Sequence, residues 1–170
     1  LIGTGSSALT GKGGSIAVTV GQGVSADGGL ITIFAGETAD PAEANSKGGS
    51  IYVDGGYHSG TAAGTHGGHI DVEGGKDSTH TGGYMSLLTG TGVTSSSGSF
   101  VIKTANSGTT GISGALTFSS GTASSQSSGE ILIGTGSSAL TGKGGSIAVT
   151  VGQGVSADGG LITIFAGETA

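Results

Sequence analysis

The chain has 170 residues, of which 40 are glycine, one is proline and none is cysteine, so disulfide frameworks and cysteine-based metal sites are excluded. All five of its basic residues are lysines and its net charge is −6, which argues against nucleic-acid binding. No apolar run approaches the roughly 18 residues that a membrane-spanning helix needs, so we expect no membrane span.

A short motif, a pair of glycines followed by an alternating segment, recurs along the whole chain. It first reads Gly-Gly-Ser-Ile-Ala-Val at residues 13–18, and later copies open with Gly-Gly or Ser-Gly. The copies start 15 to 20 residues apart, at positions 13, 28, 48, 67, 82, 97, 113, 128 and 144. A fixed motif at such spacing is typical of solenoids and related arrays.

In the first eight copies the fourth and sixth residues are always apolar, while the residue between them varies. Apolar residues at a period of two predict a strand with one buried face. These pairs form the predicted structural core: Ile16, Val18, Ile31, Ile33, Ile51, Val53, Ile70, Val72, Met85, Leu87, Phe100, Ile102, Leu116, Phe118, Ile131 and Ile133.

A single strand of this kind cannot bury its apolar face alone, so we expect the copies to stack on one another. The predicted fold is an all-β parallel β-solenoid (β-helix) with rungs of 15–20 residues and glycines at the corners. Composition alone also suits a disordered Gly/Ser-rich chain, but the unbroken apolar pairs argue against that alternative.

A second, longer repeat lies above the first. Residues 1–39 and 132–170 are identical at an offset of 131, which is the length of eight rungs. We expect residues 1–131 to form one eight-rung solenoid superunit and residues 132–170 to begin an identical one, without a linker. Because an uncapped rung is an edge strand that pairs with further strands, the pattern predicts association with itself, end to end and also laterally.

Acidic and histidine residues concentrate between residues 54 and 80. Stacking in register would place Asp54 over Glu73, and Asp71 lies two residues from Glu73 on the same face. Clustered carboxylates suit hard cations, so Asp54, Asp71 and Glu73 are a candidate Ca²⁺ site, with a solvated acidic surface as the alternative. No other cofactor is expected, and Ser/Thr-rich arcs between the strands are candidates for O-glycans.

Catalytic motifs are not found. The sequence has no nucleophile elbow and no phosphate loop before a helix, so we expect no catalytic residues and no enzyme activity. An ice-binding protein is one alternative, because flat solenoids with ranked threonines order water. Only two of the eight outward positions between the apolar pairs are threonine, Thr32 and Thr117.

The segments Gly-Gly-Ser-Ile-Ala-Val-Thr-Val-Gly at 13–21 and Gly-Gly-Leu-Ile-Thr-Ile-Phe-Ala-Gly-Glu-Thr at 28–38 carry a resemblance. The chain resembles the Gly/Ser-rich tandem-repeat surface proteins of diatoms and related marine microbes and, more loosely, haemagglutinin-like and autotransporter β-solenoid adhesins. The resemblance covers the whole chain and implies an extracellular or cell-surface location. We therefore expect a structural component of an extracellular filament, sheath or adhesive strand; a cation-binding surface adhesin is a further alternative to ice binding.

Overall fold

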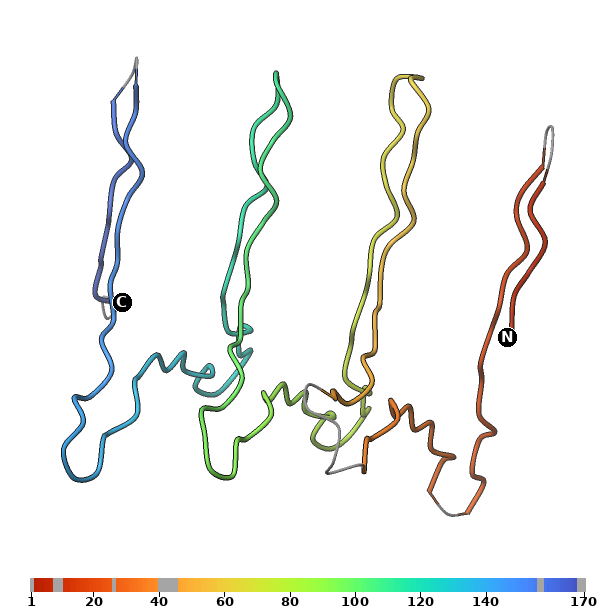
Figure 1. Cartoon of the computed structure of the whole chain (residues 1–170), viewed down its shortest axis with the longest axis horizontal. Coiled ribbons are helices and arrows are strands. Elements are labelled where there is room, and N and C mark those ends of the chain that lie inside the picture. Colours follow the sequence, from red (N-terminus) through yellow and green to blue (C-terminus); the bar gives the residue numbers. More distant parts are fainter. Residues whose placement is uncertain (1, 8–10, 26, 40–45, 156–157, 168–170) are drawn as a thin grey trace. The chain divides into compact units, whose positions relative to one another are not determined.

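The structure is a computed structural model, and it describes residues 2–7, 11–25, 27–39, 46–155 and 158–167. Within these ranges the chain contains no helix and no β-strand (Figure 1). The chain divides into two units, Leu1–Leu87 and Leu88–Ala170, and each is described by itself.

The chain reverses direction in the arcs between copies of the motif. Turns lie at residues 63–64, 109–110 and 140–141, and bends at 24–25, 78–80, 93–95, 124–126 and 155. From residue 63 onward these reversals follow the 15- to 16-residue spacing of the motif. In Figure 1 the arc of residues 56–68, drawn in yellow, shows one such reversal.

Two of the turns use left-handed backbone. Gly64 has φ of +78°, which glycine adopts without steric cost, and Leu140 has φ of +76°, which is unusual for a side chain of that size. Across the first turn, the Thr65 hydroxyl donates to the Ala62 carbonyl over 2.7 Å, so this arc is held by a bond that spans it.

Backbone hydrogen bonds close the arcs at their glycine ends. In the unit Leu1–Leu87 the second glycine of an opening pair donates its N–H to the carbonyl of the glycine that ended the previous copy. These donor–acceptor pairs are Gly14–Gly5, Gly29–Gly21, Gly49–Gly36, Gly68–Gly56 and Gly83–Gly75, at 2.7–3.3 Å. In the unit Leu88–Ala170, Gly98 donates to Gly90 in the same way over 2.9 Å.

The close approach of these backbones explains why glycine occupies the positions. A Cβ built on Gly74 would lie 2.5 Å from the carbonyl oxygen of Gly83, and one built on Gly68 would lie 2.9 Å from the nitrogen of Gly56. Atoms at such separations overlap, so a larger residue would push the two ends of the arc apart.

The predicted parallel β-solenoid is wrong. Stacked rungs require hydrogen bonds between equivalent positions of successive copies, whereas the backbone bonds of the described chain join the two ends of one arc. The described residues also contain no strand and bury no side chain. In place of stacked rungs, six arcs of the described chain, up to the one that ends at Gly98, are closed locally by a bond between glycines.

The physical reason lies in how little apolar surface one copy carries. Two buried aliphatic side chains contribute roughly 3–6 kcal/mol, which is less than the backbone entropy lost on ordering the ~15 residues of a copy. Stacking would have to supply the difference through contacts between each copy and the next one along the chain. The bonds that do form are local. Closing a loop of about ten residues costs much less chain entropy than ordering all ~15 residues of a copy.

The predicted apolar alternation is visible in the exposure of the side chains, although none of them is buried. The fourth residue of each copy, from Ile16 to Ile131, is 48–59% exposed. The large apolar residues at the outward fifth position are more exposed: Tyr52 is 84% exposed, Val101 72% and Leu132 86%. The sixth residues, from Val18 to Ile133, are 49–73% exposed, which overlaps the outward position, so the pairs form no core in the single chain.

Candidate functional site

Residues 54–80 hold all four histidines of the chain and four of its eleven acidic residues. The segment lies within the unit Leu1–Leu87. The copy from Gly67 to Val72 supplies the extended backbone, in which residues 69, 71 and 73 project to the same side. The next arc, residues 76–81, supplies a tight bend.

Two side chains on the extended part form an ion pair. Nε2 of His69 lies 3.3 Å from Oδ2 of Asp71, and both side chains are largely exposed, at 80% and 77%. Two residues further on, Oε2 of Glu73 lies 3.9 Å from Nζ of Lys76. Exposed pairs of this kind contribute little to stability, so their interest lies in the arrangement of their donor atoms.

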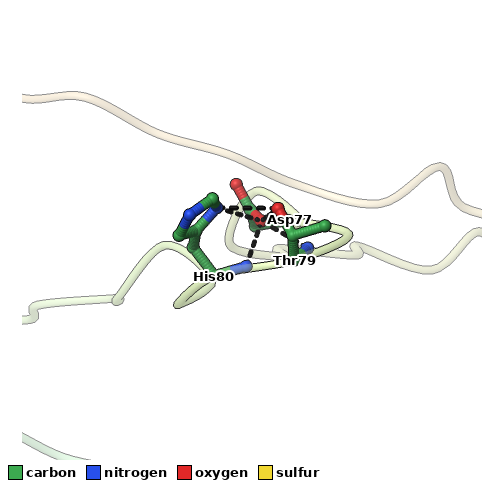
Figure 2. Close-up of polar contacts among 3 residues, drawn as sticks. All are labelled: Asp77, Thr79 and His80. Carbon is green, nitrogen blue, oxygen red and sulfur yellow. Dashed lines mark hydrogen bonds and ion pairs between the residues drawn. The ribbon is translucent and has the colours of Figure 1, made fainter.

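The bend at residues 78–80 is organised by the carboxylate of Asp77 (Figure 2). Its Oδ1 accepts the backbone N–H of Thr79 at 2.7 Å and the backbone N–H of His80 at 2.5 Å. Oγ1 of Thr79 lies 2.7 Å from Nδ1 of His80, and that ring nitrogen lies 3.5 Å from Oδ1 of Asp77.

These backbone bonds change the acidity of Asp77. Hydrogen bonds from the N–H groups of Thr79 and His80 stabilise the ionised carboxylate, and they hold the pKa of Asp77 below its ordinary value of 3.8. The side-chain hydrogen bonds of the same two residues act in the same direction. The carboxylate therefore stays charged and keeps the bend closed under mildly acidic conditions.

The three carboxylates of the candidate Ca²⁺ site do not converge. Asp71 pairs with His69 and Glu73 pairs with Lys76, while Asp54 belongs to the preceding copy. Among the described residues no group of three or more histidine or acidic side chains is placed to hold a metal ion. The calcium site thus stays a prediction from the sequence, tested by calorimetry below.

Neither the His69–Asp71 pair nor the Asp77 bend was predicted from the sequence, although both have a signal in it. Alternation along the strand-like segment places residue 69 on the same side as residue 71. The order Asp-Ser-Thr at 77–79 is typical of a turn in which an aspartate side chain accepts a backbone N–H two residues later.

The described residues form no pocket. They also include no helix that is long and apolar enough to cross a membrane. No family model, curated protein or solved structure matches the chain.

Proposed function

We propose that this chain is a structural component of an extracellular filament, sheath or adhesive strand built from tandem 131-residue repeats. The observation that carries the proposal is the exact recurrence of residues 1–39 at 132–170. An extended material needs the same unit many times, whereas a binding or catalytic site needs a particular set of residues once. The proposal assigns no reaction to the chain.

The recurrence extends from sequence to local structure. Oγ1 of Thr4 donates to the carbonyl of Gly14 over 3.1 Å, and its counterpart Thr135 donates to Gly145 over 3.2 Å. A Cβ on Gly29 would meet Cγ1 of Val20 at 2.5 Å, and the same distance separates the equivalent pair in the second copy. These contacts recur in both repeats, although the glycine closures Gly14–Gly5 and Gly29–Gly21 are present in the first repeat alone among the described residues.

The exposed apolar pairs supply the surface for self-association. Each copy presents two apolar side chains at a fixed position. The described part of the chain has no buried core in which they could be covered within one chain. Recurrent exposed apolar surface of this kind marks a contact surface. A second copy of the chain carries the same pairs at the same spacing, so it can cover them along its whole length.

The resemblance to Gly/Ser-rich tandem-repeat surface proteins supports an extracellular or cell-surface location and an adhesive role. Serine and threonine side chains in the arcs, such as Ser95, Ser96 and Ser125, are exposed and thus accessible for O-glycans. Both features belong to the proposal and are tested with the native material, by locating the chain on cells and by mass analysis of its arcs.

The decisive experiment is to measure the size of the chain as a function of concentration in metal-free buffer and to image the product by electron microscopy. We expect fibres that appear above a threshold concentration and contain copies joined with a 131-residue repeat. A stable monomer at millimolar concentration would overturn the proposal. Thermal hysteresis by a non-associating chain would favour the ice-binding alternative instead.

A further inference from the structure

We propose that the bond between Asp54 and Gly55 is a site of spontaneous covalent modification, at which the aspartate isomerises through a cyclic succinimide to isoaspartate. The inference goes beyond the proposed function and does not depend on self-association. It needs no enzyme, cofactor or metal ion, because the reacting groups belong to adjacent residues and water is the other reactant.

The first argument is the dipeptide itself. Three of the six aspartates of the chain precede a glycine, in Asp27–Gly28, Asp54–Gly55 and Asp158–Gly159. Because glycine has no Cβ, the backbone nitrogen that follows such an aspartate can approach the side-chain carboxyl carbon without a steric clash. The first and last of these aspartates adjoin residues outside the described ranges, so the argument rests on Asp54.

The second argument is that the structure leaves this bond unrestrained. Residues 51–60 are all exposed and form no helix, strand or turn. Within the described part of the chain, the N–H of Gly55 donates no backbone hydrogen bond, and the carboxylate of Asp54 takes part in no hydrogen bond or ion pair. The carboxyl carbon and the nitrogen can therefore rotate towards each other without breaking a contact.

The other two aspartates of residues 46–155 are restrained. The carboxylate of Asp71 pairs with His69 over 3.3 Å, and the next residue is the β-branched Val72, whose side chain crowds the backbone nitrogen. The carboxylate of Asp77 accepts the backbone N–H groups of the two residues that follow Ser78. Reaction at either of them has to break these contacts, so Asp54 is the reactive aspartate of this stretch.

The reaction balances in two steps. The nitrogen of Gly55 attacks Cγ of the neutral carboxylic acid of Asp54: the N–Cγ bond forms, a Cγ–O bond breaks, and the hydroxyl group leaves with the amide proton as water. Water then adds to the backbone carbonyl carbon of the ring and breaks its bond to nitrogen. The chain now continues through Cγ, the α-carboxylate becomes the side group, and no atom is oxidised or reduced.

Isoaspartate changes the arc that follows, because it inserts one methylene into the backbone directly before Gly55. At that position a Cβ would already lie 2.5 Å from the carbonyl oxygen of Gly68. The next residue, Gly56, accepts the N–H of Gly68 over 2.8 Å, and this bond closes the arc. The inserted methylene shifts Gly56 along the chain, so isomerisation opens the arc without cutting the chain.

The test uses the 170-residue chain, stored warm at neutral pH in EDTA below its fibre threshold. Trypsin cleavage after Lys47 and Lys76 releases the peptide 48–76, which contains both Asp54 and Asp71. With time we expect a form of unchanged mass that an aspartate-specific protease no longer cuts at residue 54 but still cuts at residue 71. A free synthetic peptide of residues 48–60 should convert at a similar rate. No conversion in the chain after the peptide has converted, or equal conversion at residue 71, would overturn the inference.

Two variants check the chemistry and its effect on the arc. Asp54→Glu keeps the charge but requires a larger ring, so it should abolish the conversion. Asp54→Asn should convert faster, with loss of ammonia in place of water. Hydrogen exchange at the Gly68 amide should be faster in the aged native chain than in the fresh one, and unchanged by storage in Asp54→Glu. Equal exchange in aged and fresh native chain would refute the opening of the arc. Fibre formation is measured separately, so either result leaves the proposed function to its own test.

Discussion

The substitution Leu116→Asp tests whether the apolar pairs join one chain to another. Leu116 is 51% exposed and lies in a stretch, residues 78–129, whose one charged residue is Lys103. Covering the exposed half of a leucine side chain contributes about 1 kcal/mol. Placing a carboxylate against the apolar surface of a second copy costs about 1–3 kcal/mol more.

Together these terms weaken each contact by about 2–4 kcal/mol, which corresponds to a roughly 30- to 1,000-fold higher threshold concentration for association. Light scattering over a concentration series in EDTA measures the threshold. Thr117→Asp is the matched control, since it adds the same charge at the adjacent outward position and should shift the threshold much less. Equal shifts in the two variants, or no shift with Leu116→Asp, would refute the assignment of the apolar side as the contact surface.

Three further outcomes are expected. Gly74→Ala should break the closure of the following arc and speed hydrogen exchange at the Gly83 amide, because the new Cβ would meet the Gly83 carbonyl at 2.5 Å; Gly90→Ala, with open space at its Cβ, should leave exchange at the Gly98 amide, which closes its own arc, unchanged. The bend at Asp77 should persist above pH 3.8 and open as the pH falls through the lowered pKa of that carboxyl, seen as a shift of the amide signal two residues later; a midpoint above 3.8 would contradict it. Because Asp54, Asp71 and Glu73 do not converge in the structure, calorimetry with Ca²⁺ on the native chain should give no heat of binding; heat that falls in Asp71→Asn would instead establish the predicted carboxylate site.

Local features of the structure could be predicted from the sequence, because they depend on residues close together in the chain. The spacing of the motif predicted corners at the glycines that bound each copy, and the structure places the turns and bends inside the arcs between copies, such as those at 109–110 and 124–126. The period-two alternation predicted buried pairs, but no described side chain is buried: in the third copy Ile51 is 54% exposed and Val53 68%, against 84% for Tyr52 between them. Both follow from the conformations open to glycine and from the alternation of an extended backbone.

Whether the copies stack could not be predicted from the same pattern, because it depends on whether contacts between successive copies outweigh the entropy cost of ordering both of them. The apolar pair Ile51 and Val53 is compatible with the inward face of a strand in a solenoid. It is equally compatible with an arc whose apolar side is covered only by a second chain. The sequence likewise identified Asp71 as a candidate ligand but assigned it carboxylate neighbours, since register between rungs was assumed. The structure pairs it with His69, two residues away, where no assumption about stacking is needed.

The exact repeat makes it possible to compare the exposure of the same side chains in two copies that have different neighbours. Ile16 and its counterpart Ile147 are 56% and 57% exposed, and Val18 and Val149 are both 71% exposed, although they lie in different units of the chain. The exposed apolar surface is therefore set within one copy, and it adds up with every repeat. When two arrays lie together, the second and later contacts form within one complex, so their combined strength rises steeply with the number of repeats. A weak contact per copy is then sufficient for a strong fibre, and a short chain stays dissociated at concentrations where a long one assembles.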